Sequence, residues 1–170
     1  MMARNTTPEI VGDLNSSASP HSILGFLTIT HPNLPDPIRI VSDPRNFVCG
    51  GDEYIGCPFE FKTLTENEKA STTELRVQNV DRRIGQAIEK TNTRAKVTLE
   101  VRSTRDFDLS VNPRAEIGVS TVIYGFRQFD LIDITVTAID VSGTVMLRDY
   151  SQEPYPGKRA TASRCPALFR

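Results

Sequence analysis

The octapeptide Ala95-Lys96-Val97-Thr98-Leu99-Glu100-Val101-Arg102 alternates apolar and polar side chains without a break. Successive side chains of a β-strand point to opposite faces of the sheet, so a period of two predicts a half-buried strand. We expect the apolar members on the core face. The charged members Lys96, Glu100 and Arg102 are expected in solvent.

Further runs of strand length lie on both sides of this stretch, with turn signals between them. They span residues 23–30, 38–41, 47–49, 54–62, 75–80, 117–126, 129–138 and 145–147. Proline-rich or glycine-rich turns are expected at residues 32–37, 42–45, 50–53 and 140–143. At least seven short strands separated by turns predict a mainly β fold, either an antiparallel β-sandwich or a barrel.

One segment changes its period from two to that of a helix. Four apolar residues recur on one helical face, namely Val80, Ile84, Ala87 and Ile88. Asp81 is a suitable N-terminal cap for this helix. A single short α-helix is therefore predicted at about residues 81–90.

The chain of 170 residues is long enough for one domain with a full core. We expect this domain over residues 23–149. Residues 1–22 have few aromatic side chains and are predicted to form a flexible N-terminal arm. Residues 150–170 contain Glu153-Pro154-Tyr155-Pro156 and a second proline motif, which favour an extended C-terminal arm.

The composition excludes several function classes. Twenty Lys and Arg against 21 Asp and Glu give a net charge of -1, which does not fit a general nucleic-acid binder. No apolar stretch is long enough to predict a membrane span. No secretory signal follows Met1, so folding in the cytoplasm is expected, and an odd number of cysteines does not suit a disulfide framework.

The three cysteines are the candidate metal ligands. Cys49, Cys57 and Cys165, with His31, could provide a zinc or iron–sulfur site, but the usual C-x2-C spacing is absent. The alternative is that they are packed thiols near strand ends. We expect no bound metal and no cofactor.

Catalytic constellations are equally sparse, and we predict that the chain is not an enzyme. Its two histidines, His21 and His31, lie in the N-terminal segment and before a proline, without a nucleophile motif around them. Two carboxylate pairs could support glycoside cleavage but are expected to be solvated. The pairs are Asp106 with Asp108 and Asp52 with Glu53.

A series of short motifs, in order from about residue 38 to the C-terminus, resembles a family of tailed-phage minor tail proteins of the domain-of-unknown-function 1833 type. The motifs are Ile40-Val41-Ser42-Asp43-Pro44, Gly51-Asp52-Glu53-Tyr54, Pro58-Phe59-Glu60-Phe61, Leu75-Arg76-Val77-Gln78-Asn79-Val80-Asp81-Arg82, Val97-Thr98-Leu99-Glu100-Val101, Glu153-Pro154-Tyr155-Pro156 and Pro166-Ala167-Leu168-Phe169. The arrangement is also similar to the N-terminal part of tail-tip protein L of lambda-like phages and, more loosely, to distal tail proteins.

The resemblance implies a structural subunit of a siphophage virion, at the tail tip or baseplate. Such a subunit forms part of a ring or hub that joins the tail tube to the distal tip. Its expected partners are copies of itself, the tail tube, the tail-tip hub and the tape measure, after assembly in the host cytoplasm. The family supplies no catalytic residues, and the C-terminal iron–sulfur cluster of some tail-tip proteins needs a fourth cysteine that this chain lacks.

The terminal arms are the candidate interaction elements, because extended segments can cross a subunit boundary and add backbone hydrogen bonds to a neighbouring sheet. The candidate contact residues are Tyr155, Pro156, Leu168 and Phe169, with Arg82 and Arg83 as possible contacts for an acidic partner. The alternative is that the C-terminal arm packs on its own sheet. Two other functions remain open, a host-surface carbohydrate-binding module and a small cell-wall hydrolase.

Overall fold

The computed structural model describes residues 5–61, 72–78, 94–137 and 140–147, together with residues 164 and 167. Its fold is mainly β, as the alternating pattern predicts. The elements in chain order are α1 (Pro8–Asn15), β1 (Ile23–Thr30), β2 (Ile38–Val41), β3 (Phe47–Cys49), β4 (Asp52–Gly56), β5 (Phe59–Phe61), β6 (Thr72–Gln78), β7 (Ala95–Ser103), the 3₁₀-helix η1 (Thr104–Asp106), β8 (Phe107–Asp108), β9 (Arg114–Glu116), β10 (Val122–Val136) and β11 (Asp140–Met146).

The strands form one open sheet in the order β5-β6-β11-β10-β7-β1-β2-β4-β3-β9-β8. Most neighbouring strands are antiparallel, whereas β2 pairs with β4, and β3 with β9, in parallel. Among the described strands, β5 and β8 each have a neighbour on one side only. The sheet therefore does not close into a barrel.

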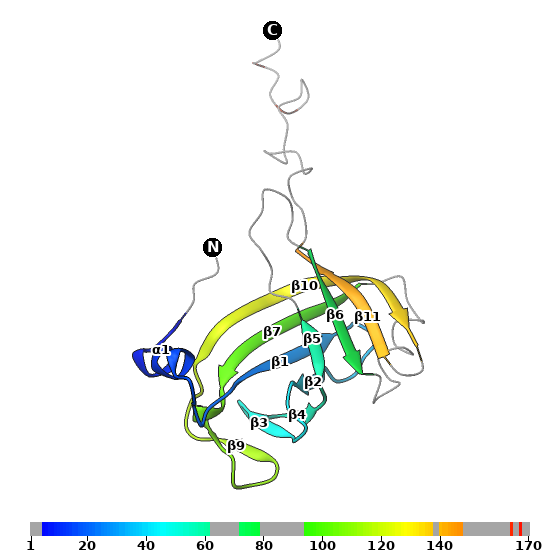
Figure 1. Ribbon diagram of the computed structural model, residues 1–170. Coiled ribbons are helices and arrows are strands. Elements are labelled where there is room, and N and C mark those ends of the chain that lie inside the picture. Colours follow the sequence, from blue (N-terminus) through cyan, green and yellow to red (C-terminus); the bar gives the residue numbers. More distant parts are fainter. Residues whose placement is uncertain are drawn as a thin grey trace.

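The sheet folds into two facing halves at the long strand β10, which belongs to both. Its first part pairs with β7 and its last part with β11, and register shifts interrupt both pairings. Asp133, at one of the shifts, has a φ of 51°. Bulges bend a strand and increase its twist. In Figure 1, β5, β6 and β11 consequently cross in front of β1, β7 and β10.

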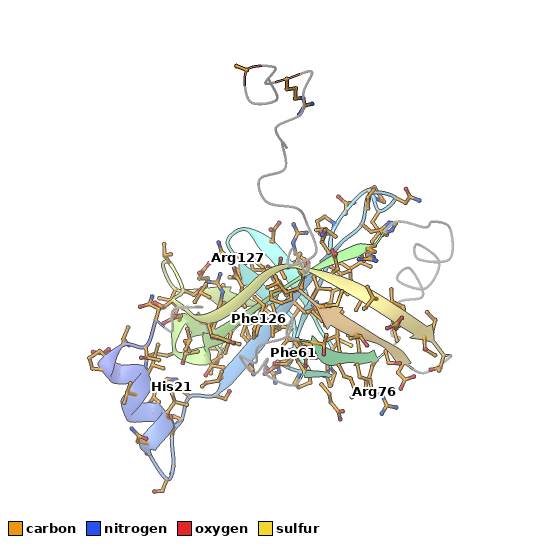
Figure 2. The ribbon with its side chains drawn as sticks, turned by 90° about the horizontal axis from the view of Figure 1, so that it is seen from above. His21, Phe61, Arg76, Phe126 and Arg127 are labelled. Carbon is orange, nitrogen blue, oxygen red and sulfur yellow. The ribbon has the colours of Figure 1, made fainter. Side chains whose placement is uncertain are left out.

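The main core lies between the two halves of the sheet. It includes Leu27 of β1 and Leu99 of β7 from one half, and Val77 of β6 from the other, each at most 3% exposed. The rings of Phe61 and Phe126, 5.4 Å apart, join the halves near the centre of the molecule (Figure 2). The predicted inward face of β7 is thus confirmed for its first three apolar residues.

A second, smaller core covers the other face of β1. Phe26 stacks on Phe107 at 5.5 Å between ring centroids and meets Phe47 edge-on at 5.8 Å. Leu24, Val41 and Cys49 complete the buried part of this cluster. Strand β1 is therefore buried on both faces, which explains why it reads as a nearly continuous apolar run.

The N-terminal segment contains an ordered helix that the sequence analysis did not predict. Thr7 caps α1, and Pro8 stands at its first turn. Asp13 of α1 accepts two hydrogen bonds from the Arg105 guanidinium, at 2.9 and 3.1 Å. The helix predicted at about residues 81–90 lies outside the described residues. No helix in the described part of the chain has the length and apolar character needed to cross a membrane.

Several predicted boundaries are wrong for local reasons. The strand expected at 54–62 is divided into β4 and β5, and β4 begins within the turn expected at 50–53. Strands were expected at 117–126 and 129–138, but a loop precedes Val122, and β10 continues across both ranges because bulges absorb its bends. A turn was expected at 140–143, but Gly143 lies within β11. A Cβ added there would stand 3.0 Å from Leu131 Cδ1, so this glycine allows close strand packing.

Candidate functional site

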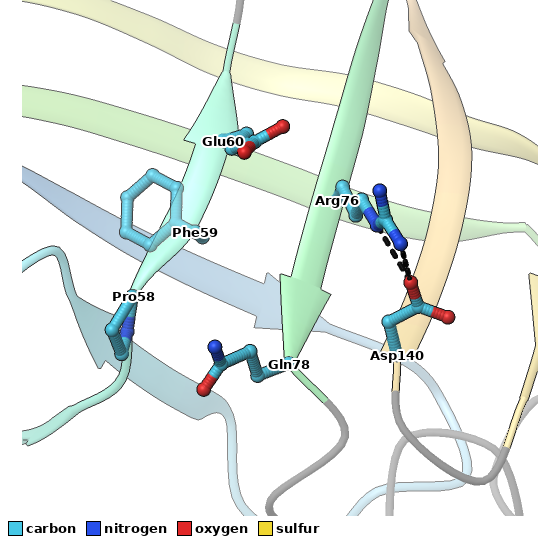
Figure 3. A pocket seen from close by; sticks show the side chains of 6 residues that line it. All are labelled: Pro58, Phe59, Glu60, Arg76, Gln78 and Asp140. Atoms are coloured by element: carbon cyan, nitrogen blue, oxygen red, sulfur yellow. Dashed lines mark hydrogen bonds and ion pairs between the residues drawn. The ribbon is translucent and has the colours of Figure 1, made fainter.

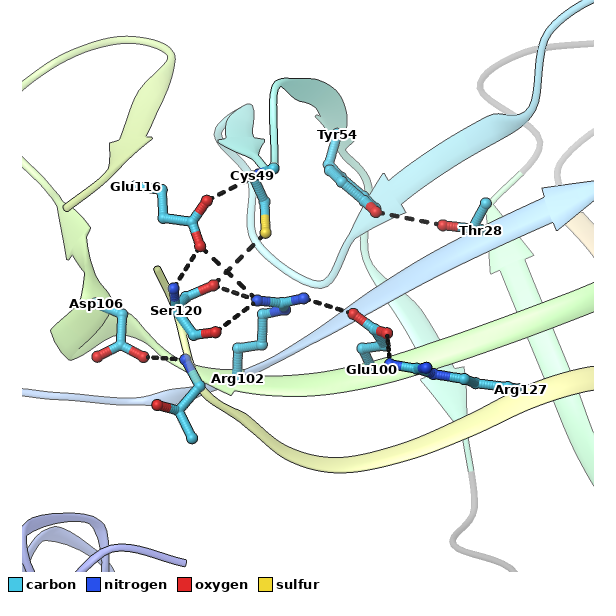
Figure 4. Close-up of polar contacts among 11 residues, drawn as sticks. Thr28, Cys49, Tyr54, Glu100, Arg102, Asp106, Glu116, Ser120 and Arg127 are labelled. Atoms are coloured by element: carbon cyan, nitrogen blue, oxygen red, sulfur yellow. Dashed lines mark hydrogen bonds and ion pairs between the residues drawn. The ribbon is translucent and has the colours of Figure 1, made fainter. Parts of the chain in front are cut away.

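The loop of residues 116–121, called the apolar loop below, is tied to the domain by its backbone. Ile117 N–H donates to the Asp106 carbonyl at 2.8 Å, and Thr121 N–H donates to the Asp106 carboxylate at 2.8 Å. The Glu116 carboxylate accepts from Gly50 N–H at 2.8 Å and from Ser120 N–H at 2.5 Å. Figure 4 shows the Asp106 and Glu116 carboxylates with their bonds, beside Ser120 and Arg102.

The tip of the apolar loop projects large apolar side chains into solvent. Ile117 is 63% exposed and Val119 is 95% exposed, on either side of Gly118 with a φ of 81°. Single exposed apolar side chains are ordinary on protein surfaces. Two of them on a backbone held at both ends are better suited to contact another surface, because little ordering is needed on binding.

Arg102 supports this loop from beneath. Its guanidinium donates to Glu100 at 2.6 Å and to the Ser120 carbonyl at 3.0 Å, also donates to the Ser120 hydroxyl, and lies 3.8 Å from Glu116. Its side chain is only 14% exposed. The prediction that Arg102 faces solvent is therefore wrong, because β3 and the apolar loop cover that face of β7. The alternating pattern of β7 does not predict that β3 and the loop cover its second face.

Burial and the neighbouring polar groups shift the pKa values of Glu116 and Arg102 in opposite directions. Burial acts to raise the pKa of Glu116, but bonds from Ser120 and Gly50 and the charge of Arg102 outweigh it, so the pKa is lowered. Burial acts to lower the pKa of Arg102, yet its bond to Glu100 leaves the pKa raised. Burial raises the pKa of the Cys49 thiol. The cluster thus holds a charged network beside a protonated thiol, an arrangement that favours structural support over nucleophilic chemistry.

A second surface feature, called the apolar hollow below, lies where β5 approaches the long strands. It has a volume of about 220 Å³. The Phe59 ring lies against Gly25, where an added Cβ would stand 2.9 Å from the ring. Its lining includes the side chains of Ile23, Phe59, Phe61, Val101 and Tyr124.

The apolar loop and the apolar hollow lie on opposite faces of β1 and β7. Val101 lines the hollow, whereas the adjacent Arg102 supports the loop. Gly25 likewise lines the hollow, whereas its neighbour Leu24 belongs to the second core with Cys49. Because alternate residues of a strand point to opposite faces, the sheet separates the two surfaces.

A third, polar hollow of about 230 Å³ lies beside β5, β6 and β11 (Figure 3). Arg76 Nε donates to Asp140 at 2.6 Å, and Phe59, Glu60 and Gln78 lie beside this pair. Arg76 is 63% exposed, so the pair contributes little to stability.

The candidate metal ligands do not come together where they can be placed. Cys49 belongs to the second core, with its Sγ 3.6 Å from the Ser120 hydroxyl, whereas Cys57 belongs to the main core. Cys165 lies outside the described residues. No group of three or more His, Cys, Asp or Glu side chains suited to a metal ion occurs among the residues that the structure places.

Of the other candidate residues, some lie outside the described part of the chain and the rest are placed by the structure. All six predicted interaction residues lie outside the described part of the chain: Arg82, Arg83, Tyr155, Pro156, Leu168 and Phe169. Of the carboxylates expected in solvent, Asp106 binds the apolar loop and Asp108 accepts from Ser110 N–H at 2.9 Å. His31 is buried just after β1, where its Nδ1 accepts from Asn33 N–H at 3.1 Å.

Comparison with known proteins gives one family. The model of the family described as "Domain of unknown function (DUF1833)" matches residues 9–159, which is most of the chain. The chain therefore belongs to this family, as the ordered motifs suggested. No curated protein matches the chain.

Proposed function

We propose that this member of the DUF1833 family is a structural subunit of a siphophage tail tip or baseplate, in a ring or hub that joins the tail tube to the distal tip. The observation that carries the proposal is the apolar loop, whose exposed Ile117 and Val119 stand on a backbone tied down by hydrogen bonds. The resemblance of the ordered motifs to tailed-phage minor tail proteins supports the same function.

A subunit of this kind needs surfaces of fixed shape more than it needs a reactive cleft. In a cyclic ring, each copy presents two different patches to its two neighbours. The apolar loop and the apolar hollow meet this requirement, since they are dissimilar surfaces on opposite faces of one sheet. The N-terminal helix α1 is bound to its own domain through Asp13 and Arg105, so we assign the further contacts with the tail tube, the hub and the tape measure to residues 150–170.

Deleting the gene from its phage genome tests the proposal. We expect particles that fail to join a complete tail to the head and that become infectious again when the protein is supplied from a plasmid. Mass spectrometry of purified wild-type particles should find the protein, and immunogold labelling should place it at the distal end of the tail. Normal tails in the deletion strain, or absence of the protein from purified virions, would contradict the proposal.

A host-surface carbohydrate-binding module is the second candidate. The observation in its favour is the polar hollow, where the Phe59 ring borders amide, carboxylate and guanidinium groups that suit sugar hydroxyls. Glycan-array binding by the full chain that is lost in Gln78→Ala would favour this candidate. Exposed Glu53→Ala on β4, outside the hollow, is the control.

A further inference from the structure

We propose that the apolar loop of one copy inserts into the apolar hollow of a second copy, in a head-to-tail contact that repeats along the assembly. This inference rests on the proposed function and specifies how the copies meet. The occupant of the hollow is the tip Ile117-Gly118-Val119, and the receiving side chains include Ile23, Val101 and Tyr124.

The sizes of the two surfaces agree. A cavity of about 150 Å³ is large enough to hold a benzene ring. The hollow, at about 220 Å³, therefore has room for one or two aliphatic side chains of the loop. Val119 is 95% exposed in the single chain, so nearly all of its apolar surface is available for burial at such a contact.

The apolar hollow and the loop tip are also both uncharged. None of the side chains that line the hollow carries a formal charge, and neither does the Ile117-Gly118-Val119 tip. The nearest carboxylate of the loop, Glu116, is turned back to Gly50 and Ser120 and is only 14% exposed. Insertion of the tip therefore buries no unpaired charge.

The placement of the surfaces dictates the symmetry. A contact between two different patches leaves one free loop and one free hollow on every pair, so each pair can add another copy. Such a contact closes into a ring when the rotation between neighbours divides a full turn, and otherwise continues as a filament. A contact of loop with loop would instead stop at a dimer.

Two single substitutions test the two surfaces in the full chain. Val119→Glu changes the loop, and Ile23→Glu changes the rim of the hollow at a residue that is 43% exposed. Val136→Glu and Ile55→Glu are matched controls, at 38% and 41% exposure on other strands. We expect each test variant to weaken self-association by about tenfold or more, while both controls associate like the wild type. Circular-dichroism melting curves confirm that each variant is folded.

Mixing the two test variants gives the decisive result. Val119→Glu retains a hollow and Ile23→Glu retains a loop, so one productive contact remains between them. Native mass spectrometry of an isotope-labelled mixture should show a one-to-one heterodimer that does not grow, whereas each variant alone stays monomeric. A wild type that remains monomeric at every accessible concentration would overturn the inference. So would an Ile23→Glu variant that assembles normally, since that outcome indicates loop-to-loop pairing or a different hollow.

This test separates the inference from the proposed function. If wild-type protein is monomeric but is still found in purified virions and is needed for tail joining, the loop-in-hollow contact is wrong and the structural role stands. If the loop and hollow variants behave as expected while the protein is absent from virions, the contact stands and the tail assignment fails.

Discussion

Glu116→Gln is expected to loosen the apolar loop without changing its tip. The Glu116 carboxylate accepts two backbone N–H groups, from Gly50 at 2.8 Å and from Ser120 at 2.5 Å. A glutamine amide has one oxygen and one NH₂ group, so one of these N–H donors then faces another donor. A buried backbone donor without an acceptor costs about 1–3 kcal/mol, and the exposed Gly50 N–H can bond to water instead, which lowers this cost. The side chain is 14% exposed, which favours the lower half of that range, about 1–2 kcal/mol.

The pH dependence of the same variant gives an independent measure. The pKa of Glu116 is lowered in the folded state, so the unfolded chain binds more protons near that pKa. The stabilising contribution of the carboxylate is then complete above the unfolded pKa of about 4.3 and is lost as the pH falls through the folded pKa. The difference in unfolding free energy between wild type and Glu116→Gln should therefore shrink below about pH 4.

The assay is urea unfolding followed by circular dichroism at several pH values, with amide hydrogen exchange at Gly50 and Ser120. Glu60→Gln, at an exposed position of β5, is the control and should leave all three readouts unchanged. A stability difference that stays constant from pH 7 to pH 3 would refute the reasoning about Glu116. Unchanged exchange protection at both amides would refute the role of the carboxylate in holding the loop.

The remaining predictions concern Arg102 beneath the apolar loop, two glycines and residues 150–170. Arg102→Met removes the cation from between two carboxylates and should cost about 2–4 kcal/mol in urea unfolding, somewhat less than for a fully buried pair. Gly56→Ala should cost about 1–3 kcal/mol by thermal unfolding, because its Cβ would stand 2.7 Å from the Arg45 carbonyl group, whereas Gly12→Ala meets nothing within 4 Å and should be neutral or stabilising. If the proposed tail function is right, deleting residues 150–170 should leave a folded protein whose incorporation into tail particles is impaired. Loss of cooperative melting would show instead that this segment belongs to the core.

The sequence predicted best those strands whose ends and core face are defined by the residues of the strand itself. The range 23–30 coincides with β1 because an apolar run begins and ends there, and the alternation of β7 is sufficient to define its core face. The pattern could not predict that the outer face of β7 is covered a second time. Arg102 is half-buried because β3 and the apolar loop return to that face from other parts of the chain, a contact that no short window of sequence contains.

In the apolar loop the error is the opposite one, because residues predicted to lie in a sheet are exposed. Ile117, Val119 and Ile123 belong to a β-branched stretch that predicts a strand, and this interpretation placed Ile117 and Val119 in a sheet. The structure instead ends β9 at Glu116 and begins β10 at Val122. Gly118 with its left-handed φ provides the turn between them. The signal that could have found this loop is that central glycine, which weakens a strand and permits the turn.

The polar network beneath the loop is better explained by geometry than by stability. A half-buried arginine between two carboxylates loses much of its Coulombic attraction to desolvation, and apolar side chains of similar volume often stabilise a protein as well or better. Apolar packing is not directional, however, whereas bonds from Arg102 and to Glu116 fix the positions of individual backbone groups in the loop. A loop held in this way loses little conformational freedom when Val119 is buried against a neighbour. It follows that Glu116→Gln should weaken self-association in the wild-type background but have little further effect once Val119→Glu is present. Native mass spectrometry of the two single variants and the double variant measures this coupling, and simple additivity would show that the network and the tip act independently.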